Sequence, residues 1–175
     1  TVSLLIEHSE KDDDIWIYLP SVKKVRRLVS SNKKDTFVGT DFSYGDVIGH
    51  KVKEWNHTLV KEEEVDGKAC YVIESIPKDA TIKNNTGYSK RISWIQKDNL
   101  VTLKAHMFDE SGEFLKELHY MNWKFSEPDK GRWQALRLEA KNAQTEHQTV
   151  IVVENSKVNQ GVKDDYFTTR YMEQQ

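Results

Sequence analysis

The chain has few of the residues that cross-link a protein, carry catalysis or cross a membrane. Cys70 is the only cysteine among 175 residues, so no disulfide can form within the chain. The sequence contains no run of about 18 apolar residues and therefore predicts no membrane-spanning segment. Charge of one sign is not in excess either: the formal net charge is −2, which gives no electrostatic reason to expect a nucleic acid as partner.

Catalytic and metal-binding motifs are also missing. The sequence has no Gly-x-Ser-x-Gly, His-Glu-x-x-His or Cys-x-x-Cys pattern and no phosphate-binding glycine loop. The best candidate pair is Glu117 and His119, which would project from one face of a strand and could serve a hydrolase as base or metal ligand. Because no third partner is visible, we expect a structural or surface role for this pair. The sequence thus predicts a protein that is not an enzyme and needs no metal or cofactor.

What the chain does contain is the alternation typical of β-strands. The clearest case runs from Leu100 to Met107, where one face is expected to hold Val101, Leu103, Ala105 and Met107. Turn signals such as Asp66-Gly67 separate the strand-like runs about every 10 to 15 residues. We therefore expect a mainly β fold built of antiparallel hairpins, with residues 1–175 as a single domain.

One segment breaks this pattern. Residues 39–49 begin with Thr40 or Asp41 as the candidate helix N-cap, and Asp46 would lie in the first turn, where an acid suits the helix dipole. Two glycines make this a short helix, better suited to a lid than to a core. The lid residues expected to face a cavity are Phe42, Tyr44, Val47 and Ile48.

A basic stretch precedes the predicted lid and ends in Arg26 and Arg27. Adjacent residues of a strand point to opposite faces, so one arginine would point inward and need a partner. Asp41 or Asp46 is the natural candidate, and such an ion pair would latch the lid shut. Two other interpretations stay open: a docking patch for an acidic partner or for lipid headgroups, and an ordinary solvent-facing strand.

The aromatic residues suggest an apolar ligand. Five tryptophans are many for this length, and a sheet with so few helices leaves an apolar face uncovered unless something else fills it. This imbalance favours a half-open barrel whose concave face holds an apolar ligand. The residues predicted to line the cavity are Trp16, Tyr18, Trp94, Leu103, Met107, Met121, Trp123 and Leu136.

Several of these residues also carry a family resemblance, whose most specific part is the stretch from residue 16 to residue 46. The matching residues are Trp16, Tyr18, Leu19, Pro20, Val25, Arg26, Arg27, Asp41, Phe42, Ser43, Tyr44 and Asp46, followed by Tyr71, Tyr88, Trp94 and residues 168–171. In these positions the chain resembles the outer-membrane lipoprotein-sorting protein family, the relatives of the periplasmic carrier LolA.

The resemblance implies an unclosed antiparallel β-barrel with a short helical lid, located in the Gram-negative periplasm. It also implies that residues 1–175 are one LolA-like domain without the signal peptide, N-terminal helix and first strands of its family.

The resemblance and the aromatic faces together predict a carrier that shields a lipid or the acyl chains of a lipoprotein. An inner-membrane exporter of the resistance-nodulation-division type is the candidate partner that the resemblance suggests. The alternative is a non-enzymatic envelope adaptor that binds a transporter or another protein and carries no lipid. The sequence does not identify the cargo, the direction of transfer or the oligomeric state.

Overall fold

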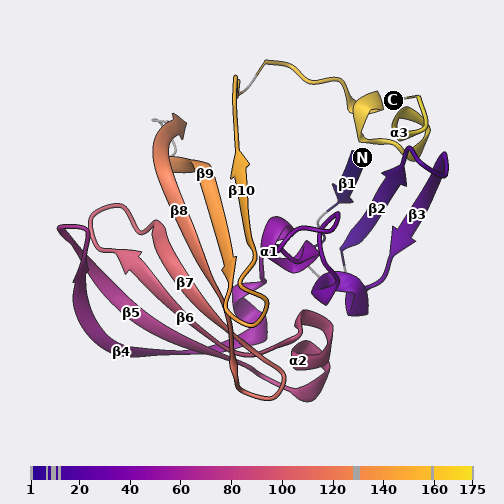
Figure 1. Ribbon diagram of the computed structural model, residues 1–175. Coiled ribbons are helices and arrows are strands. Elements are labelled where there is room, and N and C mark those ends of the chain that lie inside the picture. Colours follow the sequence, from indigo (N-terminus) through magenta and orange to yellow (C-terminus); the bar gives the residue numbers. More distant parts are fainter. Residues whose placement is uncertain are drawn as a thin grey trace.

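The computed structural model describes residues 2–6, 8, 11, 13–127, 131–158 and 160–174. Within these residues the strands form two antiparallel sheets, a small one of three strands and a large one of seven (Figure 1). The small sheet has the order β1-β2-β3, with bounds Val2–Ile6, Asp14–Leu19 and Lys24–Leu28. The predicted class, mainly β and antiparallel, is confirmed.

The large sheet is a meander, because every strand pairs with its neighbour along the chain in the order β10-β9-β8-β7-β6-β5-β4. Its strands are β4 (Trp55–Val65), β5 (Lys68–Pro77), β6 (Tyr88–Gln96), β7 (Thr102–Asp109), β8 (Phe114–Glu127), β9 (Arg132–Asn142) and β10 (Gln148–Val152). β4 and β10 are its two edges and do not pair with each other, so the barrel is an open half-barrel, as predicted.

The helices are short. They are α1 (Tyr44–Ile48), α2 (Ala80–Thr86) and α3 (Thr169–Met172), with 3₁₀ turns η1 (Ser30–Lys34), η2 (Val52–Glu54) and η4 (Asp164–Phe167). In Figure 1, α1 lies between the two sheets, and α3 lies beside the small sheet. None of the described helices is long and apolar enough to cross a membrane.

The turn between β4 and β5 shows how local sequence sets the register. Asp66 and Gly67 both have positive φ, 51° and 73°, which a two-residue hairpin turn of type I′ requires. Glycine adopts this conformation without a steric cost, and aspartate tolerates it better than most residues. The predicted turn at Asp66-Gly67 is therefore confirmed.

The two faces of the large sheet differ in chemistry. The inner face, which we define as the face covered by α1, carries a row of facing apolar residues in which Ala105 pairs with Leu118 and Leu118 with Ala140. All three are at most 2% exposed, and Phe42 of the segment before α1 packs against them. The outer face carries the neighbouring row Lys104–His119–Glu139. This alternation confirms that the meander buries one side of each strand.

A β-bulge between β6 and β7 interrupts the alternation predicted for residues 100–107. Trp94 pairs with Lys104 but Ile95 pairs with Thr102, so Leu103 is an extra residue on β7. Leu103 packs with Trp94 and Val72 on the outer side, whereas Ala105 and Met107 belong to the inner core. The prediction that Leu103 shares a face with Met107 is therefore wrong, because a single inserted residue moves it to the other face.

The small sheet has a core of its own. Tyr18 is 7% exposed and packs with Leu4 and Met172, and Trp16 packs against the same cluster. Trp16 and Tyr18 were predicted to line one cavity together with Met107. The structure places them in a different sheet, because the chain leaves β3 and crosses through η1 before it enters the large sheet.

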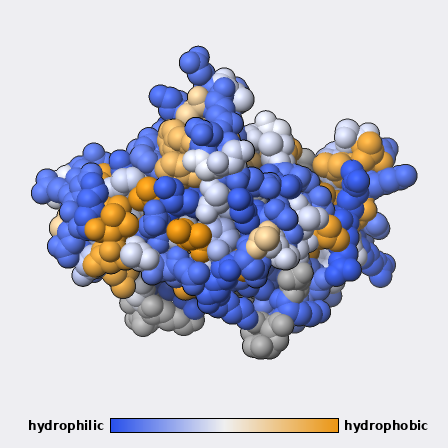
Figure 2. All heavy atoms as spheres, turned by 90° about the horizontal axis from the view of Figure 1, so that it is seen from below, coloured by the Kyte–Doolittle hydropathy of each residue, from blue (hydrophilic) through white to orange (hydrophobic). Residues whose placement is uncertain are grey.

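The surface seen from below is mostly hydrophilic, and its hydrophobic patches are separated by hydrophilic residues (Figure 2).

We expect that replacing Leu118 by alanine lowers the free energy of unfolding by about 2–5 kcal/mol, because the side chain is 2% exposed at the centre of the inner core. The control is Val152→Ala on β10, whose side chain is 54% exposed and should cost about 0.5 kcal/mol or less. Urea unfolding followed by tryptophan fluorescence measures both. Equal losses for the two variants would contradict the assignment of this core.

Candidate functional site

The candidate site is a cavity of about 440 Å³ between α1 and the inner face of the large sheet. Its apolar wall consists of Val52, Ile73, Ile95, Ala105, Met107, Leu118 and Tyr120. Its polar side chains are those of Asp46, His50, His57, Ser75, Arg91, Ser93 and Thr102, and Gly49 also lines it. A volume in the range of about 300–1,000 Å³ with an apolar wall and a few polar groups is typical of small-ligand sites.

A reciprocal capping box starts the helix that covers this cavity. Ser43 Oγ accepts a hydrogen bond from the backbone N–H of Asp46, and an Asp46 carboxylate oxygen accepts one from the N–H of Ser43 at 2.8 Å. The predicted N-cap at Thr40 or Asp41 is therefore wrong by two or three residues. Thr40 instead donates its hydroxyl hydrogen to the Phe37 carbonyl at 2.6 Å and closes a preceding turn.

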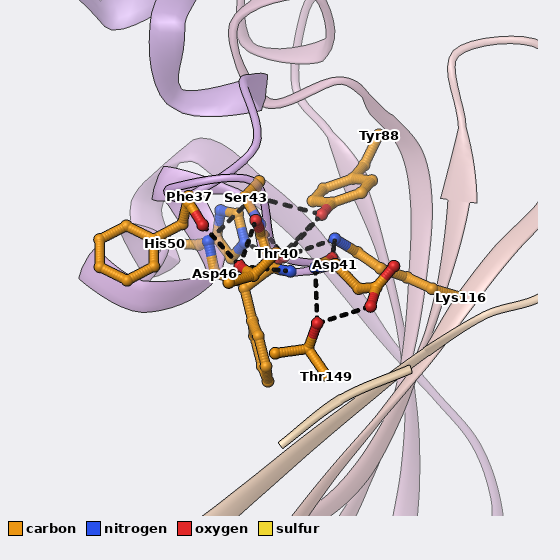
Figure 3. A network of polar contacts seen from close by, with 10 residues as sticks. Phe37, Thr40, Asp41, Ser43, Asp46, His50, Tyr88, Lys116 and Thr149 are labelled. Atoms are coloured by element: carbon orange, nitrogen blue, oxygen red, sulfur yellow. Dashed lines mark hydrogen bonds and ion pairs between the residues drawn. The ribbon is translucent and has the colours of Figure 1, made fainter. Parts of the chain in front are cut away.

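Asp46 is the centre of a buried polar network (Figure 3). Its carboxylate lies 2.7 Å from Lys116 Nζ of β8 and accepts a hydrogen bond from the Tyr88 hydroxyl of β6 at 2.9 Å. The side chains of Asp46 and Lys116 are 1% and 5% exposed. Burial by itself would raise the pKa of Asp46, but the Lys116 ammonium, His50 and the hydrogen bonds outweigh it and hold the pKa below its ordinary value. The lid is thus fastened to two strands by one buried carboxylate.

A second set of contacts holds the start of the lid. The Asp41 carboxylate accepts a hydrogen bond from the Thr149 hydroxyl and lies near His147 Nδ1, both at 2.6 Å. Lys116 Nζ also donates to the Asp41 carbonyl at 2.7 Å. These contacts join residues 41–46 to β8 and to residues 147–149 at the start of β10, both of which are distant from residues 41–46 in the sequence.

The predicted latch between these acids and Arg26 or Arg27 is not formed. Arg27 pairs with Asp14 of β2 and lies over the Trp16 ring, and Arg26 is exposed. Both arginines belong to the small sheet, and a lysine of the large sheet takes the place predicted for them. A signal for Lys116 does exist in the sequence, because it alternates with Leu118 and Tyr120 on an otherwise apolar strand face.

The four residues predicted to face the cavity from the lid have different environments. Phe42 is 1% exposed in the inner core, and Tyr44 packs edge-on against Phe37 at 5.4 Å. Val47 is 44% exposed, and Ile48 lines a second, more open hollow beside the small sheet. The cavity wall itself receives Asp46, Gly49 and His50 from this part of the chain.

The strand residues predicted to line one cavity divide between the two faces. Met107 lines the inner cavity. Leu136 lies on the inner face of β9, the same face as Leu138 and Ala140. Trp94, Leu103 and Trp123 instead pack in the outer cluster. A separate outer pocket of about 470 Å³ is lined by Leu103, Met121 and Trp123, with Lys104 and His119 among its polar neighbours.

The predicted pair of Glu117 and His119 does share the outer face. One Glu117 oxygen lies 2.6 Å from His119 Nε2, and the other lies 2.5 Å from His106 Nε2 on β7. Burial would raise the pKa of Glu117, but its two histidine partners hold it below the ordinary value. In the part of the chain that the structure describes, no group of three or more His, Cys, Asp or Glu residues is placed to hold a metal ion.

Three buried nitrogen atoms near the lid have no hydrogen-bond partner among the described residues: Arg91 Nε, His50 Nε2 and Trp55 Nε1. Burial, and then the nearby Arg91 charge, lower the pKa of His50 to about 4, so the ring is neutral at pH 7. Burial also lowers the pKa of Arg91, whose guanidinium lies 5.6 Å from the centre of the Trp55 ring. Sequence reasoning did not identify these residues, since each stands alone in its segment.

We expect Asp46→Asn to lower the free energy of unfolding by about 3–5 kcal/mol at pH 7, because it leaves Lys116 buried without its partner. The folded-state pKa of Asp46 is depressed, so its stabilisation is present above the ordinary value of 3.8 and is lost as pH falls through the folded-state pKa. Denaturant unfolding from pH 7 to pH 3 measures both effects. The control is Asp46→Asn/Lys116→Met, which should recover part of the loss; a double variant as unstable as the sum of the single variants would contradict the pairing.

The neutral state of His50 predicts a second pH effect. Its folded-state pKa of about 4 lies below the ordinary 6.5, so the stabilisation is complete above pH 6.5 and is lost as pH falls towards 4. The loss amounts to about 3 kcal/mol over this window. His50→Gln should show a correspondingly smaller change in unfolding free energy between pH 7 and pH 5. A ring that protonates near pH 6.5 in an NMR titration would contradict this prediction.

Comparisons with known proteins agree with this architecture. A family described as "Uncharacterized protein" matches residues 1–174, and no curated protein matches the chain. A solved domain from Vibrio parahaemolyticus, described as an outer membrane lipoprotein-sorting protein, is 29% identical with a TM-score of 0.86, over 98% of this chain and 70% of that one.

Two further structures extend the comparison. A DUF1329 family protein from Desulfovibrio piger is 30% identical with a TM-score of 0.82, over 97% of this chain and 69% of that one. A LolA superfamily protein from Nitrosomonas europaea is 24% identical with a TM-score of 0.64, over 90% and 67%, and shares the fold. On the match to the DUF1329 protein and on the family model over residues 1–174, the chain belongs to the family of the DUF1329 protein, and its fold is LolA-like.

Proposed function

We propose that this protein is a non-enzymatic carrier that binds a lipid, or the acyl chains of a lipoprotein, in the inner cavity beneath the lid. The observation that carries the proposal is the cavity itself, in which an apolar sheet face is covered by a lid held through polar contacts. Each methylene transferred from water would contribute about 0.8 kcal/mol. About a dozen methylenes therefore suffice for useful affinity.

The open edge of the sheet gives such a ligand a route into the cavity. Leu59 of β4 pairs with Ile73, a residue of the cavity wall, and its side chain is 55% exposed. The apolar inner face thus reaches the edge strand at this pair. An acyl chain could enter the cavity at β4 while the contacts of Asp46 and Asp41 still hold the lid in place.

We place this carrier in the Gram-negative periplasm, where it would hand its cargo between envelope components. The family membership and the description of the Vibrio parahaemolyticus relative support this location. An inner-membrane exporter of the resistance-nodulation-division type is the proposed partner, on the resemblance alone.

An adaptor that binds another protein is the second candidate, and one observation favours it. The edge strand β10 exposes Val150 and Val152, at 40% and 54%. On the next two strands of the sheet, β9 and β8, the rings of Trp133 and Phe125 stack at 4.7 Å and are also exposed. An unpaired edge with apolar side chains is suited to strand addition by a partner.

The first test separates these candidates. We expect gently purified protein to yield a near-stoichiometric lipid on organic extraction and mass spectrometry, and to bind the uncharged probe Nile red. Thr102→Trp, which fills the inner cavity, should weaken Nile red binding at least tenfold. The control His106→Trp, on the outer face of the same strand, should change it less than twofold.

The remaining outcomes each have a meaning. Loss of binding in Met121→Trp instead of Thr102→Trp would move the ligand to the outer pocket of Leu103, Met121 and Trp123. A protein that carries no lipid and binds no Nile red would overturn the carrier proposal in favour of the adaptor.

A further inference from the structure

Arg91 is a charged residue in the wall of an otherwise largely apolar cavity. It lies on the inner face of β6, where its register neighbours are Ser75 of β5 and Met107 of β7. All three residues line the cavity. A guanidinium stays protonated in proteins, so a full positive charge faces this space.

This charge has no anionic partner among the described residues. The nearest candidate acid, Asp46, is already paired with Lys116 at 2.7 Å and with the Tyr88 hydroxyl. Arg91 forms no ion pair within 4.0 Å with any residue that the structure describes, and its Nε lacks a hydrogen-bond partner. Its guanidinium lies over the Trp55 ring, 5.6 Å from the ring centre, and the Asp46 carboxylate attracts it only from beyond ion-pair distance. A buried charge without a partner is costly, so a ligand that brought an anionic group to this wall would relieve that cost.

The surroundings add hydrogen-bonding capacity at the same end of the cavity. His50 Nε2 is buried 4.0 Å from an Asp46 carboxylate oxygen and has no hydrogen-bond partner among the described residues. His50 lines the cavity together with Arg91. Because the ring of His50 is neutral, Arg91 is the cationic group at this end of the cavity. The ring of His50 can still donate one hydrogen bond.

The apolar wall extends away from this polar end along one strand. Beyond Arg91, the next inward residues of β6 are Ser93 and Ile95, which face Ala105 and Thr102 across the sheet. Four residues of strand span about 13 Å. The cavity therefore has the Arg91 guanidinium near the lid and, beyond it, a wall in which Ile95 and Ala105 lie beside Ser93 and Thr102.

We propose that the ligand of this cavity is a single-chain amphiphile with an anionic headgroup, a carboxylate or a phosphate, and that Arg91 binds that headgroup. This inference rests on the proposed carrier function. Guanidinium matches carboxylate and phosphate through paired hydrogen bonds, which a hydroxyl or an amine cannot form. The volume of about 440 Å³ is near the lower end of ligand sites and favours one chain over several.

The test compares ligands that share a chain and differ in headgroup. Displacement of Nile red by dodecanoate, monododecyl phosphate, dodecanol and dodecylamine gives four dissociation constants for the wild-type protein. We expect at least one of the two anions to bind about tenfold or more tightly than dodecanol, and dodecylamine to bind most weakly. Comparison of the two anions identifies the headgroup.

Variants assign this preference to Arg91. Arg91→Gln should weaken anion binding at least tenfold and leave dodecanol binding unchanged, which also shows that the cavity is intact. Arg91→Lys keeps the charge and should retain part of the preference. The matched control Arg137→Gln removes an arginine from the outer face, where Arg137 pairs with Glu139, and should change neither constant.

The outcomes separate this inference from the proposed function. Equal affinities for anions and dodecanol in the wild-type protein, or a preference that survives Arg91→Gln, would overturn the role of Arg91 while the carrier stands. Failure to bind Nile red or any of the four ligands would overturn the carrier itself.

Discussion

The buried contact between the Lys116 ammonium and the Asp46 carboxylate is the constraint on which the rest of the site depends. Asp46 and Ser43 form the capping box of α1. The Asp46 carboxylate also accepts a hydrogen bond from the Tyr88 hydroxyl of β6 and forms an ion pair with Lys116 of β8. One carboxylate therefore determines where the short helix begins and how it lies on the sheet. A helix of five residues has little stability of its own, so its position comes from these long-range contacts.

The strength of this contact depends on the exclusion of water from it. An ion pair in a dry site is strong only while its desolvated geometry is kept, and entry of water or of a competing charge weakens it sharply. Apolar packing of Phe42 against the inner core gives no comparable dependence on a single contact. The position of the lid therefore depends on the single residue Asp46 more than on any one apolar contact.

Local patterns predicted the architecture well and the site only in part. Alternation and the Asp66-Gly67 turn predicted the meander, and residues 39–49 were correctly identified as the segment that covers it. The bulge that moves Leu103 to the outer face depends on pairing between β6 and β7 and leaves no signal within either strand. The partners of Asp46 lie 42 and 70 residues away, which no local pattern can link. The sequence predicts an ion pair between Arg26 or Arg27 and an acid of the lid. In the structure Arg27 pairs with Asp14 inside the small sheet, and no pattern in the sequence indicates that this sheet is separate from the large one.

The two free edges of the large sheet are chemically unlike. β4 carries the charged run Lys61-Glu62-Glu63-Glu64, and like charges that would meet across a shared edge oppose the pairing of two copies there. β10, Gln148-Thr149-Val150-Ile151-Val152, has no charged residue and presents no such opposition. The two edges therefore differ: charge repulsion opposes the addition of a strand at β4 and does not oppose it at β10. A strand added to this sheet, from this protein or from another, would meet the least electrostatic opposition next to β10.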